Sequence, residues 1–338
     1  MINVQQLTKR YARNLAVNHI SFEVEKGQIV GFLGPNGAGK TTTMRMLTCF
    51  LPPTAGTAKV AGYDVLEEPL EVKKRIGYLP ETPPLYLEMR TAEYLEFVGS
   101  IKGLRGDELK RRVGYAMERC AVDDVQNKVM GKLSKGYRQR VGLAQAIIHN
   151  PDVLILDEPT AGLDPKQINE TRDLIKSLSG DHTIILSTHI LPEVEQTCEH
   201  VLIINQGRLV ATDTVNNLQR RARGESAVLV EVAGRGVPLQ EQIVQQRLEQ
   251  VANVSAVSFK EARDGGLIFE VHGKANQNQA LRGDVARAIV ESGWDLNELR
   301  GSAASLEEVF LQLTSSDAPE KPSAKTRKEK LAMAGAQG

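Results

Sequence analysis

Residues 34–41 read Gly34-Pro35-Asn36-Gly37-Ala38-Gly39-Lys40-Thr41, and Thr42 follows directly. This spacing fits G-x-x-x-x-G-K-[ST], a loop whose backbone N–H groups surround the phosphates of a nucleotide. Glycines allow the unusual dihedrals and the close backbone approach that such an anion nest needs. In this loop the lysine, here Lys40, reaches the β- and γ-phosphates, and the Thr41 hydroxyl binds Mg²⁺. The stretch therefore predicts a site for nucleotide phosphates.

The segments on either side of this loop predict a strand and a helix. Residues 28–33 are an apolar run after a Lys-Gly turn and indicate a buried strand. Residues 39–50 indicate a helix that ends before two prolines, with its positive N-terminus toward the phosphates. A glycine turn without a ligand is the alternative, and the flanking strand and helix disfavour it. No G-x-G-x-x-G occurs, so the loop is not the dinucleotide fingerprint.

Length and composition indicate an ordinary globular protein, because 338 residues suggest about two domains. The formal net charge is zero, so no global field favours nucleic acid or an anionic surface. The three cysteines are scattered, as expected of reduced thiols in a cytosolic protein rather than a disulfide framework or metal cluster. The longest apolar runs have the length of strands, and the N-terminus lacks a signal peptide's apolar stretch. Any membrane role would therefore need a membrane partner.

Two further predicted strands end in chemically active side chains. The apolar run 153–156 leads into Asp157 and Glu158, and the run 183–188 leads into His189. Because ligands of open parallel sheets bind outside the carboxyl ends of the strands, we expect these side chains beside the phosphate loop. Asp157 then holds Mg²⁺, Glu158 orients or deprotonates the attacking water, and His189 reaches the γ-phosphate. A solvated acidic turn and a structural histidine are the alternatives.

Tyr11 lies in a polar stretch, residues 9–13, ahead of an alternating strand pattern. An exposed aromatic ring at this position would stack on a base. On spacing alone, a half-buried surface tyrosine is the favoured interpretation.

The remaining patterns predict the domain organisation. We assign residues 1–222 to a nucleotide-binding domain, whose helical subdomain covers about residues 88–150. Residues 225–316 follow the order β-α-β-β-α-β, which predicts a small ferredoxin-like α+β domain for regulation or dimer contact. A capping box opens a final apolar helix near residues 305–314. Residues 317–338 lack an apolar period and predict a disordered tail.

Together these motifs resemble the ATP-binding subunit of an ATP-binding cassette (ABC) transporter, over roughly residues 1–220. The resemblance implies an α/β P-loop NTPase fold with a mixed sheet core and a helical subdomain, with ATP and Mg²⁺ bound. It makes residues 34–41 the Walker A loop and residues 154–158 the Walker B strand with Glu158 as catalytic residue. The resemblance also assigns Ser134 and Gly136 to the signature, Asp164 to the D-loop, His189 to the switch position and Tyr11 to adenine stacking.

Two positions depart from the family pattern. The signature reads L-S-K-G-Y, so Lys135 and Tyr137 replace a glycine and a glutamine. A lysine there adds positive charge near phosphate. At the Q-loop position stands Glu81, which can bind Mg²⁺ or a water as a ligand but cannot donate a hydrogen bond as an amide does.

The resemblance also implies how the chain works. In this family each ATP lies between the Walker A loop of one subunit and the signature of another, so a second ATP-binding subunit is needed, and we expect a homodimer. A membrane permease is the expected partner, docked at the 81–89 loop, which places the chain on the cytoplasmic membrane face. On the residues alone, an ordinary proline-rich surface loop is the favoured interpretation of 81–89. Drug-export and gliding-motility cassettes look most alike, so export is expected. A soluble ATPase acting on nucleic acid or ribosomes, and a non-hydrolysing nucleotide sensor, are the alternatives.

Overall fold

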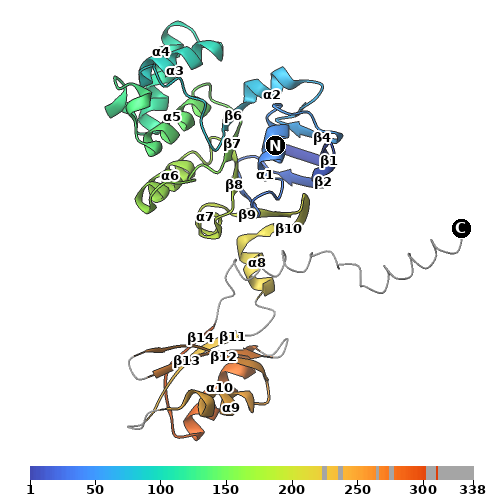
Figure 1. Cartoon of the computed structure of the whole chain (residues 1–338), viewed down its shortest axis with the longest axis vertical. Coiled ribbons are helices and arrows are strands. Elements are labelled where there is room, and N and C mark those ends of the chain that lie inside the picture. Colours follow the sequence, from blue (N-terminus) through green and yellow to red (C-terminus); the bar gives the residue numbers. More distant parts are fainter. Residues whose placement is uncertain (223–226, 235–238, 264–265, 274–277, 302–309, 311–338) are drawn as a thin grey trace, which may run out of the picture.

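The structure, a computed structural model, describes residues 1–222, 227–234, 239–263, 266–273, 278–301 and 310. Its centre is a six-stranded sheet with the order β10-β9-β3-β8-β7-β6 (Figure 1). The strands are β3 (Ile29–Leu33), β6 (Ile76–Leu79), β7 (Val153–Asp157), β8 (Thr183–Thr188), β9 (His200–Asn205) and β10 (Arg208–Thr214). Five of them run parallel and β10 pairs antiparallel with β9. Because β3, β7 and β8 are buried along their whole length, they are nearly continuous apolar runs.

A second sheet is antiparallel and has the order β2-β1-β4-β5. Its strands are β1 (Ile2–Tyr11), β2 (Asn14–Val24), β4 (Ala55–Val60) and β5 (Tyr63–Asp64). Helix α1 (Lys40–Leu47) contacts strands of both sheets and buries Met44, Met46 and Leu47 between them. The helix is shorter than the predicted span 39–50, because Cys49 turns to φ 55° and the next amides bond back to the carbonyl of Arg45.

A helical part covers the β6 side of the central sheet (Figure 1). It contains α3 (Thr91–Ile101), α4 (Gly106–Arg119), the 3₁₀ turns η1 (Asp123–Val125) and η2 (Met130–Lys132), and α5 (Lys135–Ile147). Helix α2 (Pro69–Arg75) lies outside this part, against β5 and β6, and its buried Val72 belongs to the core around α1. Gly103, with φ 94°, follows the end of α3, and Gly106, with φ 56°, is the first residue of α4. Buried side chains of α3, α4 and α5 join Leu154 and Leu156 of β7 in one apolar core, so the helical part is packed onto the sheet and does not have a core of its own. The other helices of this unit are α6 (Pro165–Ser177), α7 (Leu191–Thr197) and α8 (Val215–Ala222).

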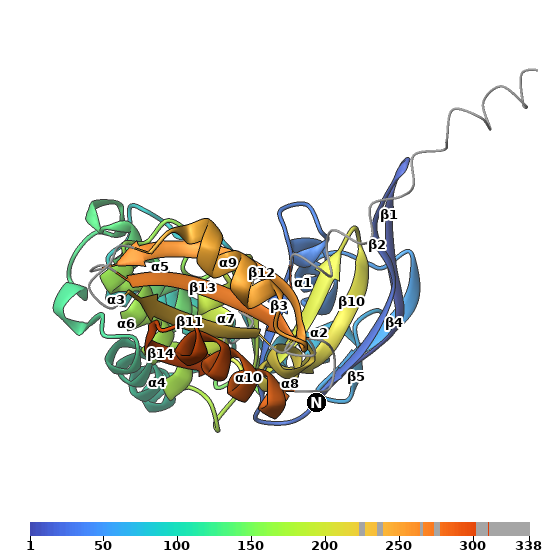
Figure 2. The same ribbon diagram turned by 90° about the horizontal axis from the view of Figure 1, so that it is seen from below.

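The C-terminal unit has its own sheet and core (Figure 2). Its elements are β11 (Ala227–Ala233), α9 (Glu241–Glu249), β12 (Val254–Arg263), β13 (Gly266–Gly273), α10 (Asn278–Glu291) and β14 (Asp295–Gly301). The strand order β12-β13-β11-β14, all antiparallel, is the ferredoxin-like order that the sequence predicts. The two helices cover one face, where Val230, Phe269 and Val285 are fully buried. The predicted fold class, a mixed-sheet cassette followed by a small α+β domain, is confirmed.

Parts of the predicted organisation lie outside the described residues. These are the linker near residue 224, the tail 317–338 and the final helix near 305–314, of which only Phe310 is described. Phe310 packs against the apolar core that the central sheet shares with the helical part. The chain therefore returns to the first unit after completing the second.

The separate cores predict separate unfolding. Phe269 is fully buried in the second unit, with its ring 5.6 Å from that of Phe259, so Phe269→Ala should cost this unit about 3–5 kcal/mol. Trp294, the single tryptophan, packs against the same core and reports on this unit alone. In urea, the tryptophan fluorescence transition should move to lower concentration while the circular dichroism transition of the larger unit stays in place. Phe32→Ala should do the reverse, and equal shifts of both transitions would show one cooperative unit instead.

Candidate active site

The parallel strands bring the predicted site residues to one edge of the central sheet. Strand β3 ends in Leu33, which lies beside Thr188 of β8, and Asp157 of β7 lies beside Ser187. The loop 34–39, the Asp157-Glu158 pair and His189 thus follow directly from three adjacent strand ends. This is the position where open α/β sheets bind ligands.

The phosphate loop needs its glycines for two physical reasons. Gly37 and Gly39 have φ of 79° and 110°, which side chains rarely adopt. A Cβ atom on Gly34 would lie 2.4 Å from the carbonyl oxygen of Ile204, and one on Gly39 would lie 2.6 Å from that of Ala16. The backbone N–H of Ala38 bonds to the carbonyl of Pro35 at 3.2 Å and closes the turn at the base of the loop. Loop shape is therefore set by close backbone packing.

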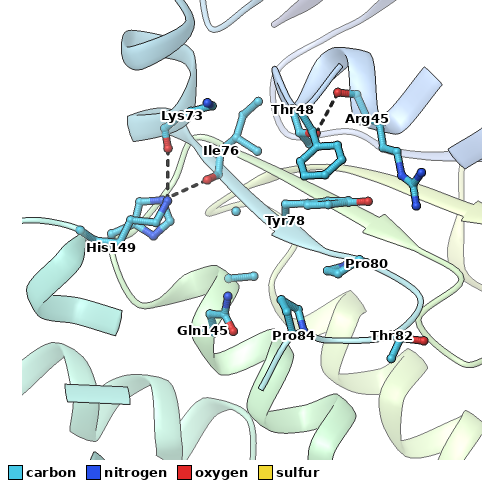
Figure 3. Close-up of a pocket in the computed structure, with 14 residues that line it drawn as sticks. Arg45, Thr48, Lys73, Ile76, Tyr78, Pro80, Thr82, Pro84, Gln145 and His149 are labelled. Carbon is cyan, nitrogen blue, oxygen red and sulfur yellow. Dashed lines mark hydrogen bonds between the residues drawn. The ribbon is translucent and has the colours of Figure 1, made fainter. Parts of the chain in front are cut away.

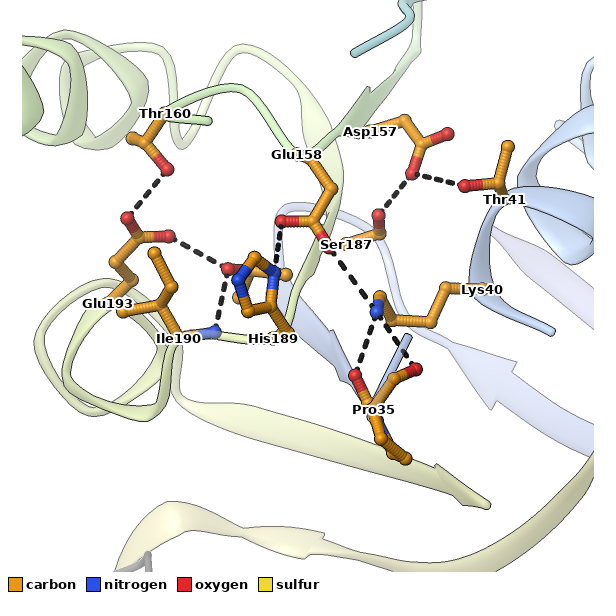
Figure 4. Close-up of polar contacts among 12 residues, drawn as sticks. Pro35, Lys40, Thr41, Asp157, Glu158, Thr160, Ser187, His189, Ile190 and Glu193 are labelled. Atoms are coloured by element: carbon orange, nitrogen blue, oxygen red, sulfur yellow. Dashed lines mark hydrogen bonds and ion pairs between the residues drawn. The ribbon is translucent and has the colours of Figure 1, made fainter. Parts of the chain in front are cut away.

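Lys40 is buried and lies across this loop (Figure 4). Its Nζ donates to the carbonyl oxygens of Gly34 at 2.7 Å and Pro35 at 3.3 Å, and it is 3.3 Å from Oε1 of Glu158. A buried ammonium needs such partners to offset the loss of hydration. The same three contacts hold the charge at the mouth of the loop.

Glu158 connects this lysine to His189. Nδ1 of His189 lies 2.9 Å from Oε2 of Glu158, and because a carboxylate only accepts, Nδ1 carries the proton (Figure 4). The Glu158 backbone has φ 50°, and its N–H bonds to the carbonyl of Ser187 at 3.0 Å. This left-handed turn at the strand end directs the next residues away from the sheet. Lys40, Glu158 and His189 form one line of contacts.

Asp157 and Thr41 form a second cluster beside it. Oδ1 of Asp157 accepts hydrogen bonds from the hydroxyls of Thr41, at 3.3 Å, and Ser187. Burial raises the pKa of Asp157, the two hydroxyls oppose that rise, and the nearby charges of Glu158 and Glu81 add to it. A divalent cation would relieve this crowding of negative charge.

The oxygen groups of this cluster fit Mg²⁺. Magnesium prefers oxygen ligands and is held in nucleotide sites by one or two protein groups together with phosphates and waters. Thr41 and Asp157 supply such a pair, and Glu81 lines one pocket with Thr41. Within the described ranges no group of three or more His, Cys, Asp or Glu side chains could hold a metal alone. The arrangement therefore suits a metal that arrives with phosphate.

An open pocket unites most of the predicted residues. Its lining includes Tyr11, Asn36, Gly37, Gly39, Lys40, Thr41, Thr42, Glu81, Glu158 and His189. The Tyr11 side chain is 42% exposed, with the Lys9 ammonium 5.4 Å from its ring centre, so one aromatic ring is open to a ligand. Asn14, Ala16 and Ala161 also line the pocket, and no feature of the sequence marks them.

Seven predicted residues do not line this pocket: Gly34, Pro35, Ala38 and Asp157, which adjoin it, and Ser134, Gly136 and Asp164, which lie elsewhere. Ser134 and Gly136 line another hollow beside Gln167, and Oγ of Ser134 caps α5 by accepting from the N–H of Tyr137 at 3.3 Å. Asp164 caps α6, because its Oδ1 accepts from the N–H of Gln167 at 2.9 Å. Within one chain, the signature and the phosphate loop therefore belong to different surfaces.

Sequence reasoning missed two supporting residues, Ser187 and Glu193. Glu193 is buried and accepts from the hydroxyls of Thr160 at 2.6 Å and Thr188 at 2.9 Å, which ties the loop after Glu158 to the strand end before His189 (Figure 4). Ser187 lies two residues before His189 at the end of the same strand, so its position in the sequence could have placed it near the site. Nothing in the sequence distinguishes Glu193 from other acids on helices.

Comparison with known proteins agrees with this geometry. Residues 17–161 match the model of the ABC transporter family. The chain is 35% identical to the bacitracin transport ATP-binding protein BcrA of Bacillus licheniformis, over 93% of this chain and 97% of that protein. It is 33% identical to the daunorubicin resistance ATP-binding protein DrrA3 of Streptomyces coeruleorubidus, over 94% and 96%.

A solved structure of the ATP-binding subunit of an ABC transporter is 30% identical, with a TM-score of 0.60 over 66% of this chain and 93% of that one. The predicted family resemblance is thus confirmed by sequence over nearly the full length and by structure over the cassette. The chain belongs to the ABC transporter family, among its ATP-binding, ATP-hydrolysing subunits.

Proposed function

We propose that this chain hydrolyses ATP at the Lys40, Glu158 and His189 cluster and thereby drives export of a substrate through a separate membrane subunit. The observation that carries the proposal is the line of contacts from the buried Lys40 through the buried Glu158 to the more exposed His189, next to the Thr41–Asp157 pair. The first cluster supplies a cation and a base, and the second supplies oxygen ligands. Both lie at the end of a phosphate-binding loop.

Each residue has a defined role in this reaction. Lys40 leaves the carbonyls of Gly34 and Pro35 and binds the β- and γ-phosphates. Thr41 and Asp157, with Glu81, would hold Mg²⁺, which would neutralise charge on the phosphates when bound. Tyr11 stacks on the adenine ring.

Hydrolysis then proceeds by in-line attack of water on the γ-phosphorus. Glu158 accepts a proton from that water, the bond from the γ-phosphorus to the bridging oxygen breaks, and ADP and inorganic phosphate leave. His189 orients the Glu158 carboxylate through the Nδ1 hydrogen bond. The intact pair argues against a non-hydrolysing sensor, and the zero net charge argues against a nucleic-acid motor.

A second copy of the chain completes the site. Ser134 and Gly136 lie on a surface separate from the phosphate pocket, so they serve a nucleotide bound by another subunit. The N-terminus of α5 then faces the γ-phosphate, where the helix dipole favours negative charge. Because ADP lacks the γ-phosphate that the second copy contacts, ATP joins two copies and ADP does not.

A groove near the site suits the membrane partner (Figure 3). We call this the docking groove; it is lined by Arg45, Thr48, Phe50, Lys73, Ile76, Gly77, Tyr78, Pro80, Thr82, Pro84, Lys102, Gln145, Ala146 and His149. Its floor is largely apolar, Phe50 is 72% exposed, and the lining holds three cations and no carboxylate. Burial and the charge of Lys73 lower the pKa of Lys102, while burial and Lys102 lower that of His149 to about 4. This crowding of cations favours a partner segment that carries carboxylates.

The docking groove is physically connected to the ATP site. Arg45 and Thr48 belong to α1 or its end, and α1 begins at the phosphate loop. Tyr78 lies on β6, which leads to Glu81, and burial together with the charge of Asp157 raises the pKa of Tyr78 to about 12. A segment seated there touches both elements that flank the nucleotide. No described helix is long and apolar enough to cross a bilayer. A membrane subunit seated in the docking groove would hold the chain at the cytoplasmic face of the membrane.

Export rests on similarity. BcrA is a bacitracin transport protein and DrrA3 a daunorubicin resistance protein by name, and both match over more than nine tenths of this chain. The match therefore includes the small C-terminal unit as well as the cassette.

Replacing the catalytic carboxylate tests the hydrolytic roles. Glu158→Gln keeps the shape of the side chain but removes the base, so turnover should fall by ~10²–10⁴-fold while ATP binding persists. Steady-state phosphate release and equilibrium nucleotide binding measure the two effects. Glu108→Gln, an exposed change on α4, is the matched control. Near-normal phosphate release by Glu158→Gln would show that another group is the base.

The same variant tests the paired arrangement. Trapped ATP should hold two copies together, so sedimentation of Glu158→Gln should show dimers with Mg-ATP and monomers with Mg-ADP. A monomer with bound ATP would contradict the homodimer and point to a different second subunit.

Charge reversal tests the docking groove. Lys102→Glu should reduce retention of the chain on washed host membranes by about tenfold, the equivalent of about 1.4 kcal/mol. ATPase activity of the free chain should stay unchanged, because Lys102 lies outside the phosphate pocket. Lys110→Glu, an exposed reversal on α4, should be retained normally. Equal retention of the two variants would exclude the groove as the membrane contact.

A further inference from the structure

The first turn of α5 packs against the segment that follows Glu158 in the same subunit. A Cβ atom on Gly136 would lie 2.8 Å from Oε1 of Gln167. A Cβ atom on Gly162 would lie 2.3 Å from Nζ of Lys135, so the ammonium occupies the space beside that glycine. Two successive residues of the signature thus have different neighbours: Lys135 lies against the segment between Glu158 and α6, and Gly136 lies against the first turn of α6.

Lys135 is the residue that departs from the family glycine, and a glycine could not make this contact. Its side chain is exposed, and in the part of the chain that the structure describes no carboxylate lies within ion-pair distance of it. The positive end of the α5 dipole disfavours an ammonium close to the helix N-terminus. Gly162, with φ 69° and no side chain, leaves open the position that the ammonium takes.

The segment from Glu158 to Asp164 is held by its own hydrogen bonds. The N–H of Ala161 bonds to the carbonyl of Glu158 at 3.1 Å, and that of Leu163 bonds to the carbonyl of Thr160 at 3.1 Å. The Thr160 hydroxyl is also fixed by Glu193 at 2.6 Å (Figure 4). A displacement at Gly162 is therefore passed toward Glu158, because few free dihedrals remain to absorb it.

We propose that Lys135 is a positioning residue that links the signature turn to Glu158 of its own subunit through the contact with Gly162. The proposal rests on the proposed function, in which the signature turn meets the nucleotide of the other subunit. A shift of that turn then changes the placement of the base in the first subunit. Lys135 thus joins one nucleotide site to the other within a single chain.

A direct contact of Lys135 with the phosphate of the second subunit is the competing role. The two roles differ in kinetics, because a phosphate contact changes ATP affinity, whereas a positioning contact changes turnover at saturating ATP. The two roles also differ in their dependence on Gly162. A substitution at Gly162 should alter the effect of Lys135 only if Lys135 acts through the contact with Gly162.

The experiment is a double-mutant cycle on the full-length chain, with Lys135→Met, Gly162→Ala and both together. Lys135→Met keeps the stem and removes the charge, and the methyl of Gly162→Ala fills the position of the ammonium. We expect Lys135→Met to lower kcat about tenfold with KM for ATP within about twofold. The double variant should be no slower than the slower single variant. Lys110→Met serves as the matched control, and thermal melting checks that each variant is folded.

Three results would overturn the proposal. One is wild-type kcat in Lys135→Met. Another is a change confined to KM and to ATP-dependent dimer formation, which would assign Lys135 to the phosphate. The third is a double variant whose loss is the product of the single losses. If the wild-type chain itself hydrolysed no ATP, the proposed function would be overturned. That result differs from the three above, in which the wild-type chain is active.

Discussion

The crowding of negative charge at one buried sheet edge is the constraint on which this site depends. Asp157 and Glu158 are both nearly inaccessible, and Glu81 lies close enough to contribute to the raised pKa of Asp157. Such a group of acids is stable only beside a compensating cation or with a proton retained. Lys40 offsets part of this negative charge through its contact with Glu158. It reaches the acids because the phosphate loop places the first residue of α1 at the same edge of the sheet. The site is thus prepared for a further cation and a polyanion together.

Much of this arrangement follows from the sequence because it depends on strand ends. Asp157, Glu158 and His189 each follow an apolar run, and parallel strands bring such positions together without any knowledge of side-chain contacts. The topology of the C-terminal unit followed from a different signal, the order β-α-β-β-α-β along the chain, which is the ferredoxin-like order. Glu193 could not be found this way, because its partners are Thr160, in the loop after β7, and Thr188, at the end of strand β8, and the helix that carries Glu193 bears no mark of either. Helix ends were also missed, since the end of α1 depends on a single left-handed residue, Cys49.

Ser134, Gly136 and Asp164 illustrate a different limit of sequence patterns. The motifs predict that these residues bind nucleotide as the phosphate loop does. The order of motifs along a chain does not show which surface of the folded chain each motif occupies. In the structure, Ser134 and Asp164 cap helices α5 and α6, and neither lines the phosphate pocket. Their predicted contact with nucleotide remains a prediction that depends on a second subunit. Capping explains, however, why short polar residues fit these positions even in a single chain.

Phe310 follows the small C-terminal unit in the sequence but packs against the core of the cassette. The solved cassette that resembles this chain spans 66% of it, so a cassette can exist without such an extension. Here the chain leaves the cassette, builds a second core and then returns an aromatic ring to the first one. The unit is therefore closer to an inserted module than to an appended one. A premature stop codon shortly after β14 would leave the C-terminal unit complete but would remove Phe310 from the core of the cassette. Truncation of the chain after β14 would therefore affect the cassette and not the C-terminal unit.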